Sequence, residues 1–371
     1  MSTNLNALQV AAAKVNAATP GAAASESPVR WRDRGVVRRE VVYSVLHQKL
    51  LARTDGGEWD LRNPVKPSAA VEHLRSLGVS AGAAEELLLD RRYNVIHGVD
   101  RNPRKAEFFR QSGQRILNTY RSPALTIRKG EFPGIMGLLT SVTGGDDEAT
   151  NWLMNWMAAK VQEPGLQSLT APVLVGAPGI GKTKLGLVLA EILGERNCAT
   201  LGPADLRSKF NASYVDKLLV VANEIVGPQV SRDFENRFKA YVTDPTVMLH
   251  DKYVRSHHRQ NRMSWWLTSN NLLPLRLDSD DRRFTVIENR RPASDSVRRE
   301  LEGLHAADGR WSRGARVQIG RFAHHLQHYR VDRELARRPL KNEARDRLIQ
   351  MTRLLEMASQ QHRRNTEMRH G

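Results

Sequence analysis

Short apolar runs alternate with stretches of helical periodicity between residues 169 and 288. The apolar runs are rich in branched aliphatic and aromatic residues, and they cover residues 173–175, 218–222, 247–249, 265–268 and 284–287. Helical patterns occupy residues 185–193 and 233–242 between them. Strands that alternate with helices in this way predict an α/β fold with a parallel sheet.

Helical patterns also flank this core on both sides. They cover residues 38–52, 68–77, 83–90 and 150–160 before it, and residues 321–329 and 340–357 after it. Trp152 and Trp156 share one face of the predicted helix 150–160, which favours a core role over base stacking. We expect a disordered tail at 1–28, a small mostly helical domain at 29–130, an α/β core at 131–291 and a basic helical region at 292–371.

The composition is strongly basic, with a formal charge of +17 at pH 7 and a pI of about 10.4. A surplus of this size favours a polyanionic partner, nucleic acid before an anionic membrane, although it also serves solubility. No apolar stretch approaches the roughly 20 residues of a membrane span, and the N-terminus lacks the apolar core of a secretory signal. The single cysteine, Cys198, excludes an internal disulfide. These features predict a soluble, cytoplasmic protein.

One segment carries a complete phosphate-binding signature, G-x-x-x-x-G-K-[ST], between a predicted strand and a predicted helix. It consists of Gly176, Ala177, Pro178, Gly179, Ile180, Gly181, Lys182 and Thr183. Such glycines allow backbone N–H groups to surround phosphate oxygens at a helix N-terminus. Lys182 can reach the β- and γ-phosphates, and the Thr183 hydroxyl can bind Mg²⁺. These eight residues and the following Lys184 are the predicted site for ATP, or another nucleoside triphosphate, with Mg²⁺.

A carboxylate follows the second apolar run, where residues 218–222 lead into Asn223 and Glu224. Glu224 is the candidate base that positions and deprotonates the attacking water, and Thr183, Asn223 and Glu224 are the candidate Mg²⁺ ligands. An acid is usual where Asn223 stands, and an amide brings no charge to the metal. Nucleotide binding is therefore better supported than hydrolysis, and a plain surface role for Glu224 stays open.

Two further polar segments flank later strands. Asn270 follows the fourth apolar run, where an amide can contact the γ-phosphate or the catalytic water, although a plain Asn-rich turn has the same composition. Arg282 and Arg283 precede the fifth run. An arginine at this place can stabilise transition-state charge at the nucleotide of a neighbouring subunit, or it can form a structural pair with Asp281.

Several short strings occur in a fixed order along the chain. Besides the phosphate loop and the strand that ends at Glu224, they are Asn118-Thr119-Tyr120, Phe210-Asn211, Tyr241-Val242-Thr243, Thr268-Ser269-Asn270, Asp281-Arg282-Arg283-Phe284, residues 321–329 and Pro339-Leu340-Lys341-Asn342-Glu343-Ala344. In this order and spacing they resemble a superfamily 3 helicase, a branch of the AAA+ ATPases, and most of all the helicase part of phage and plasmid primase-helicases. The resemblance covers residues 95–358 and is strongest over 170–290.

The resemblance implies a ring, usually a hexamer, that moves along single-stranded DNA in the 3′ to 5′ direction. It implies that Glu224 is the catalytic acid, Asn270 the sensor 1 residue and Arg283 the arginine finger, with Arg282 as the alternative. The family also carries a DNA-contacting hairpin before the sensor strand, here residues 247–263. Phosphate contacts from this hairpin would give affinity without sequence choice. Its DNA-binding candidates are Lys252, Tyr253, Arg255, His257, His258 and Arg259.

Two features depart from the family pattern. Asn223 replaces the usual acid, and no large primase domain with a cluster of metal-binding acids precedes residue 130. We therefore expect a stand-alone, ATP-driven replicative DNA helicase of a phage or mobile element, with any primase on a separate chain. Two alternatives stay open: a DNA-binding AAA+ switch or loader with slow turnover, and a nucleotide-stabilised oligomeric scaffold. The histidine pairs at 257–258 and 324–325 lack the partners of a zinc site.

Overall fold

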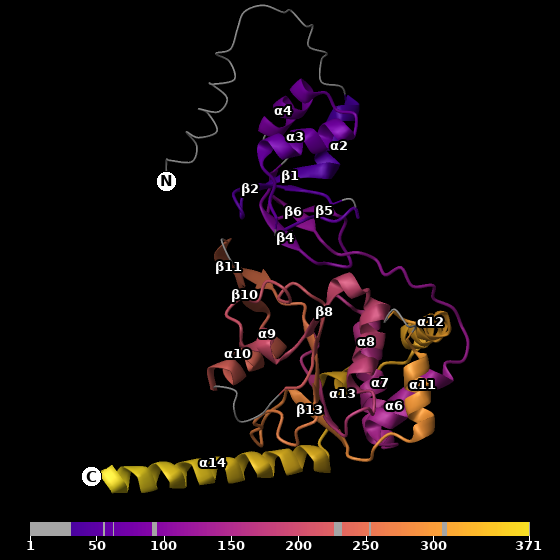
Figure 1. Ribbon diagram of the computed structural model, residues 1–371, viewed down its shortest axis with the longest axis vertical. Helices are drawn as coiled ribbons and strands as arrows, with labels where there is room; N and C mark the ends of the chain where they lie inside the picture. The colour runs from indigo at the N-terminus through magenta and orange to yellow at the C-terminus, as the bar shows by residue number, and fades with distance from the viewer. Residues whose placement is uncertain are drawn as a thin grey trace, which may run out of the picture. The chain divides into compact units, whose positions relative to one another are not determined.

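The computed structural model describes residues 31–54, 56–61, 63–90, 95–225, 232–251, 254–305 and 310–370 (Figure 1). The chain divides into two compact units, one of Met1–Ser44 and Gln48–Val95 and the other of Val45–His47 and Ile96–Gly371. No helix in these described ranges is long and apolar enough to cross a membrane. The predicted tail at 1–28 lies outside the described residues.

The first unit packs helices against a small sheet. Its helices are α2 (Trp31–Glu40), α3 (Pro67–Ser76) and α4 (Ala81–Leu89), and its strands β1 (Val41–Ser44) and β2 (Lys49–Ala52) pair antiparallel. The short strand β3 (Val95–Ile96) lies on the other side of β1. Small and branched apolar residues form the core of this unit: Val37, Val41, Ala52, Ala70, Leu74, Val79, Ala83, Ala84 and Leu87.

The segment 29–130 differs from the mostly helical domain that the sequence predicted. Its described part contains six strands besides three helices. The predicted helix 38–52 was wrong: α2 ends at Glu40, and β1 and β2 follow it. The run Val41-Val42-Tyr43 explains the difference. β-Branched and aromatic residues favour strands, and each residue of this run pairs with a residue of β2. The apolar residues that suggested a helix therefore belong to two short strands.

The second unit begins with a three-stranded sheet of order β4-β6-β5. Strands β5 (Phe108–Gln111) and β6 (Gln114–Asn118) form a hairpin, and β4 (Gly98–Asp100) pairs parallel to β6. Residues 119–132 then lead to the next helix and pass directly over α12 (Arg313–His328). The approach is so close that a Cβ on Gly320 would lie 2.2 Å from the carbonyl oxygen of Thr126. Gly320 therefore permits this crossing.

A five-stranded parallel sheet forms the centre of the second unit. Its order is β13-β7-β12-β9-β8. Every residue of β7, β9 and β12 is buried, as expected for strands covered on both faces. The predicted α/β fold with a parallel sheet is confirmed. The strands are β7 (Ala171–Gly176), β8 (Cys198–Leu201), β9 (Leu219–Ala222), β12 (Ser264–Ser269) and β13 (Phe284–Asn289).

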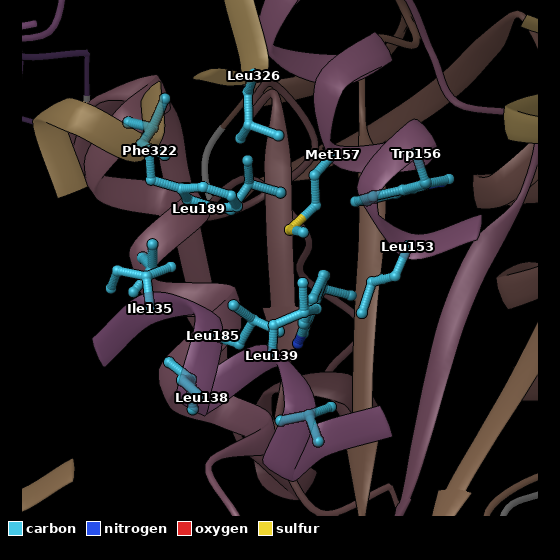
Figure 2. Packing of buried hydrophobic residues seen from close by; sticks show 14 of the residues in the cluster. Ile135, Leu138, Leu139, Leu153, Trp156, Met157, Leu185, Leu189, Phe322 and Leu326 are labelled. Carbon is cyan, nitrogen blue, oxygen red and sulfur yellow. The ribbon is translucent and has the colours of Figure 1, made fainter. Parts of the chain in front are cut away.

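One apolar cluster joins this sheet to α6 (Pro133–Thr143), α7 (Asp147–Gln162), α8 (Lys182–Leu193) and α12. Figure 2 shows aliphatic, methionine and aromatic side chains from these helices meeting in the cluster. Trp152 and Trp156 of α7 are fully buried, and their indole N–H groups donate to the carbonyl oxygens of Arg338 and Thr170. The predicted core role of both tryptophans is confirmed.

A second apolar cluster involves α10 (Arg232–Thr243), β10 (Thr246–Asp251) and the first turns of α14 (Glu343–His370), and β10 forms a hairpin with β11 (Val254–Gln260). The hairpin strands pair antiparallel and precede β12 in the chain. The apolar pattern predicted β10 alone, because the polar run Ser256-His257-His258-Arg259-Gln260 of β11 lacks a strand signal of its own, whereas the family resemblance implied a hairpin over residues 247–263. The remaining elements are η1 (Glu195–Asn197), α9 (Pro203–Arg207), α11 (Asp295–Gly303) and α13 (Arg333–Arg337).

Candidate functional site

The strand order brings three separate segments to one edge of the central sheet. β7 leads into the phosphate loop, β9 leads into Asn223 and Glu224, and β12, which lies between them, leads into Asn270. Because the strands are parallel, their carboxyl ends share one edge, which is where open α/β sheets bind ligands. The strand order thus explains how residues 88 positions apart come into contact.

The phosphate loop depends on glycines in backbone conformations that L-residues rarely adopt. Gly176, Gly179 and Gly181 have φ angles of 156°, 81° and 94°. A Cβ on Gly176 would lie 2.0 Å from the carbonyl oxygen of Asn289, at the end of β13. Ile180 is fully buried and anchors the loop to the core. The loop conformation therefore requires glycine where the motif places it.

The first turn of α8 is held against Trp266 of β12. The indole Nε1 of Trp266 donates to the carbonyl oxygen of Lys182 at 3.0 Å. Gly186 gives the ring its space, because a Cβ there would lie 2.7 Å from the indole. This packing fixes the N-terminus of α8, whose free N–H groups and dipole favour an anion.

Lys182 directs its ammonium group toward the sheet edge. Its Nζ donates to the carbonyl oxygens of Gly176 and Ala177, at 2.8 and 2.9 Å, and to Oδ1 of Asn270 at 2.9 Å. These three acceptors use every N–H of a charged lysine. Burial lowers the pKa of Lys182. A phosphate beside it would act in the opposite direction, because a nearby negative charge favours the protonated amine.

Three side-chain oxygens meet next to Lys182. The hydroxyl of Thr183 donates to Oδ1 of Asn223 at 2.9 Å. The hydroxyl oxygen of Thr268 lies 3.4 Å from the Thr183 hydroxyl oxygen and 3.4 Å from Asn223 Oδ1. Oxygen ligands of this kind suit Mg²⁺, which usually completes its coordination with substrate phosphates and water. In the described part of the chain, no group of three His, Cys, Asp or Glu side chains could hold a metal. A metal here would therefore depend on phosphate oxygens.

Glu224 is exposed at the same edge, and its backbone has a φ of 51°. Non-glycine residues rarely adopt this left-handed conformation, which costs on the order of 1 kcal/mol. Hydrogen bonds on both sides enforce it: the backbone N–H of Asn223 donates to Leu201 O at 2.8 Å, and that of Ile225 donates to Thr268 O at 3.1 Å. Conformations of this kind concentrate at functional sites.

Lys182, Thr183, Glu224 and Asn270 line one cavity of about 480 Å³, a size typical of small-ligand sites, whereas Asn223 is not part of its lining. A larger cavity of about 670 Å³, beside α8 and β8, contains none of the predicted site residues. The smaller cavity is therefore the candidate site. Its lining consists of Pro178, Gly179, Gly181, Lys182, Thr183, Lys184, Glu224, Thr268, Ser269, Asn270, Arg298 and Glu302.

Four of these lining residues, Thr268, Ser269, Arg298 and Glu302, were missed as site residues at the sequence level. Thr268 and Ser269 are the last two residues of a buried strand that leads into Asn270, so their position was a usable signal. Arg298 and Glu302 come from α11, which belongs to no recognised motif, and only the fold brings them to the cavity. Burial lowers the pKa of Lys184, and the carboxylate of Glu302 opposes that shift.

Arg282 and Arg283 lie at the opposite end of β13 from the cavity. Phe284, the first residue of β13, pairs with Ala171, whereas Asn289 pairs with Gly176 at the phosphate loop. A six-residue strand is about 20 Å long. Neither arginine can therefore contact the phosphate loop of its own chain.

The two arginines differ in their surroundings. Arg283 Nη1 lies 3.1 Å from Oδ2 of Asp281, whose side chain is only 2% exposed, and the backbone N–H of Arg283 donates to the same carboxylate at 2.8 Å. Arg282 is exposed. The structural Arg–Asp pair that the sequence left open is therefore present at Arg283.

The hairpin of β10 and β11 occupies the place at which the sequence expected the DNA-contacting segment. Its pairing puts His257 opposite Leu249 and Arg259 opposite Val247, and both aliphatic partners are buried. His258, one residue out of phase, is exposed. Because side chains alternate along a strand, the predicted cluster of residues 257–259 is split between two faces.

The other predicted DNA-binding residues are described only in part. Lys252 and Tyr253 lie outside the described residues, as does the side chain of Arg255. Arg259 differs from the expectation of a phosphate-contacting surface residue. Its guanidinium is half-buried, donates to the carbonyl oxygen of Val99 and contacts His257 Nε2 at 3.0 Å. Burial lowers the pKa of Arg259, and the nearby Asp216 and Asp100 raise it.

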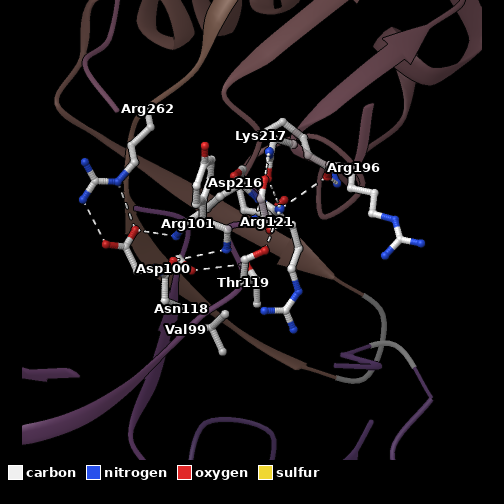
Figure 3. Close-up of polar contacts among 12 residues, drawn as sticks. Val99, Asp100, Arg101, Asn118, Thr119, Arg121, Arg196, Asp216, Lys217 and Arg262 are labelled. Atoms are coloured by element: carbon white, nitrogen blue, oxygen red, sulfur yellow. Dashed lines mark hydrogen bonds and ion pairs between the residues drawn. The ribbon is translucent and has the colours of Figure 1, made fainter. Parts of the chain in front are cut away.

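A polar network holds the base of the hairpin to β4 (Figure 3). Arg262 forms a two-pronged ion pair with Asp100, at 3.1 and 2.9 Å. Arg101, the residue after Asp100, pairs with Asp216 at 2.9 Å and also donates to Asn197 Oδ1 at 3.1 Å. Asp100 at the end of β4 thus binds the hairpin base, and Arg101, the residue after it, binds the segment before β9.

Comparisons with known proteins place this chain near a phage replication protein. A family of unknown function (DUF5906) matches residues 174–283, which include the phosphate loop, Glu224 and Asn270. The DNA primase-polymerase of Nitratiruptor phage NrS-1 is 26% identical over 259 residues. That match covers 67% of this chain, but the chain spans only 34% of the relative's length.

Solved structures support the same relationship at the level of fold. An apo structure of the NrS-1 C-terminal region aligns with a TM-score of 0.69 and 20% identity, over 88% of this chain and 76% of that one. A second apo structure of the region gives a TM-score of 0.68 at the same identity, over 87% and 74%. The resemblance to superfamily 3 helicases remains an inference from the motifs.

Proposed function

We propose that this chain is a Mg²⁺-dependent ATPase of the AAA+ type that acts on single-stranded DNA, as the helicase motor of a phage or mobile-element replication system. The observation that carries the proposal is the convergence of Lys182, Thr183, Glu224 and Asn270 on one cavity at the carboxyl edge of a parallel sheet. Lys182 and Thr183 come from the phosphate loop, whereas Glu224 and Asn270 come from two other segments of the sequence.

Each residue has a task in this proposal. The loop N–H groups and Lys182 hold phosphate oxygens, and Thr183 with Asn223 holds Mg²⁺, which neutralises phosphate charge when bound. Glu224 accepts the proton of the attacking water, because its carboxylate is exposed and lines the cavity. Asn270 lies between the loop lysine and Glu224, so its amide can orient the water or the terminal phosphate.

The arginines before β13 support action as a ring. They lie at the far end of this strand from the phosphate loop, so they can serve only a nucleotide on another chain. An arginine supplied by a neighbour stabilises transition-state charge only after assembly, which ties hydrolysis to the oligomer. Arg282 is exposed and available for this task, whereas Arg283 would have to leave Asp281. A homo-hexamer is the proposed assembly.

Three observations support DNA as the partner. The chain carries a formal charge of +17, and a hairpin precedes β12, the strand that leads into Asn270. The similar phage protein is a DNA primase-polymerase, which supports a role in replication. Hairpin contacts to the phosphate backbone would give affinity with little dependence on sequence. A primase on a separate chain would be the natural working partner.

A DNA-binding switch or loader with slow turnover is the second candidate function. Asn223 favours it, because its amide accepts a hydrogen bond from Thr183 where an acid would add charge to the metal site. Asn223→Asp separates the two candidates. Faster turnover or tighter Mg²⁺ binding in this variant would show that the missing charge limits hydrolysis in the natural protein. Unchanged rates would show that Thr183, phosphate and water hold the metal adequately.

The proposal is tested by nucleotide binding to the natural protein and to Lys182→Ala, measured by titration with a fluorescent ATP analogue. Oligomer mass is measured in parallel with and without ATP. The natural protein should bind and assemble, and the variant should lose both properties while keeping its folded core. Equal binding by both proteins would remove the phosphate-loop assignment.

A further inference from the structure

The last turn of α12 brings two histidine rings together. His324 and His328 are four residues apart and therefore lie on the same side of the helix. Their ring centroids are 4.1 Å apart and their planes differ by 19°. His324 is half-buried and His328 is exposed, so the pair is accessible from solvent. His325 instead contacts the rings of Phe132 and Tyr329. The adjacent histidines therefore diverge, whereas the histidine one turn further along forms a pair with His324.

A hydrogen bond fixes the tautomer of His328. Its Nδ1 lies 2.8 Å from the carbonyl oxygen of His324. A carbonyl oxygen can only accept, so Nδ1 is the donor and carries the proton. In the neutral ring, Nε2 then holds the lone pair that a metal uses. Metal-binding histidines usually show this arrangement, in which the second ring nitrogen donates to a carbonyl or a carboxylate.

The remaining ring nitrogens are available to a ligand. Within the described residues, neither the His324 ring nor Nε2 of His328 makes a hydrogen bond or an ion pair. Two imidazoles that share a metal about 2.1 Å from each nitrogen have ring centroids roughly 4.5 to 5.2 Å apart. The observed separation of 4.1 Å is slightly shorter, so rotation of the side chains can open the pair without moving the helix.

The position of the pair on α12 also favours a cation. The helix ends at His328, so both rings belong to its last turn or lie just before it. The last carbonyl groups of a helix lack intrahelical partners, and the negative end of the helix dipole lies there. A positive ion bound by the two rings would therefore meet a favourable field.

We propose that His324 and His328 form a two-histidine site for a divalent transition-metal ion of the Zn²⁺ class, with water in the remaining coordination positions. Imidazole suits Zn²⁺, Ni²⁺ and Cu²⁺, whereas Mg²⁺ prefers oxygen ligands. The site is thus chemically distinct from the Mg²⁺ position at the phosphate loop, and it does not depend on the proposed function. A bound ion would cross-link the last turn of α12, whose Phe322 and Leu326 pack in the core cluster.

Calorimetric titration of the tag-free protein with ZnCl₂, without nucleotide, tests this proposal. Two protein ligands should give an affinity well below that of a four-ligand structural zinc site. His324→Ala and His328→Ala should each weaken Zn²⁺ binding at least tenfold, because each removes one of two ligands. MgCl₂ should not compete for the site. Lys182→Ala should bind Zn²⁺ normally, which separates this site from the nucleotide cavity.

The matched control is His325→Ala, which removes a histidine from the same turn but not from the pair. It should bind Zn²⁺ like the natural protein. Excess Zn²⁺ should raise the melting temperature of the natural protein and of this control, but not that of His328→Ala, because an ion that binds the folded chain stabilises it. Melting without metal should confirm that the exposed His328→Ala variant folds.

Three results would overturn the site. The first is equal Zn²⁺ affinity in His328→Ala and the natural protein, and the second is an equal loss of affinity in His325→Ala. The third is the absence of saturable Zn²⁺ binding by the natural protein below about 1 mM, where the binding free energy is already small.

Discussion

The Nζ of Lys182 donates a 2.9 Å hydrogen bond to Oδ1 of Asn270. The lysine follows β7 and the amide follows β12, so the bond joins the ends of two neighbouring strands of the central sheet. On the far side of β12, β9 brings Asn223 and Glu224 to the same edge. The order of three strands therefore assembles a lysine, an amide and a carboxylate that the sequence keeps apart.

Glu224→Gln should abolish ATP turnover and leave nucleotide affinity nearly unchanged. The amide has almost the same shape as the carboxylate but cannot accept the proton of water. A loss of at least a hundredfold in the hydrolysis rate is expected, within the range for a general base. Steady-state hydrolysis and nucleotide titration measure the two properties. A variant with more than a tenth of the natural rate would contradict the assignment.

Arg282→Ala should mainly reduce ATP turnover, and Arg283→Ala should mainly reduce stability. Arg282 is exposed, so its loss should reduce turnover in the assembled protein without changing the free energy of unfolding. Arg283 pairs with the buried Asp281, so its loss should cost about 1–3 kcal/mol of unfolding free energy. Urea unfolding and hydrolysis rates separate the effects. If Arg283→Ala retained full stability and lost turnover, Arg283 would be the residue that acts across subunits.

Lys252→Ala should weaken single-stranded DNA binding, and Arg259→Ala should mainly weaken folding. Lys252 belongs to the predicted DNA-contacting segment, whereas Arg259 donates to the carbonyl oxygen of Val99 inside the protein. Removal of one phosphate contact should also reduce the dependence of log affinity on log salt concentration by about 0.7, the value for a single strand.

A salt series of DNA affinities for both variants is the measurement. Basal hydrolysis without DNA should persist in Lys252→Ala. Equal affinities and equal salt slopes for Lys252→Ala and the natural protein would exclude this lysine from the DNA path and direct attention to the basic C-terminal helices.

Lys160 should make stability rise with pH above neutrality. Its Nζ is buried, donates to the carbonyl oxygens of Leu166 and Arg262, and has a pKa lowered by burial to about 7. Between pH 7 and the unfolded value of about 10.4, the unfolded chain binds the proton that the folded chain releases. Stability from this group is therefore lowest below pH 7 and increases as pH rises through that window.

Urea unfolding at pH 7 and pH 9 checks this effect against Lys160→Met, with the exposed Lys341→Met as the matched control. The natural protein and the control should gain about 2 kcal/mol more than Lys160→Met between these pH values. The same pH response in all three proteins would show that Lys160 keeps an ordinary pKa in the folded state.

Much of the central sheet could be predicted because its strands are short, apolar and separated by clear helices. The phosphate loop was visible because its glycines are required locally by positive φ angles and by the approach of Gly176 to Asn289. The sequence could not predict strand order, and strand order is what places Asn270 between Lys182 and Glu224. It also could not show that α11 brings Arg298 and Glu302 to the cavity.

The errors have equally local causes. Residues 41–52 form two strands because pairing between β1 and β2 outweighed an apparent helical period. The basic run at 257–259 looked like a single surface cluster, but strand pairing with Val247 and Leu249 turns His257 and Arg259 toward the interior. In both cases the deciding interaction was a cross-strand neighbour, which a linear pattern does not contain.

The rate of ATP hydrolysis as a function of single-stranded DNA concentration tests the central claim most directly, with Lys182→Ala as the blank. We predict Mg²⁺-dependent turnover by the natural protein that increases at least severalfold with DNA, and no turnover above background by Lys182→Ala at any DNA concentration. Turnover that is absent, or that is the same in both proteins and indifferent to DNA, would contradict the account of this cavity as the ATPase site of a DNA motor.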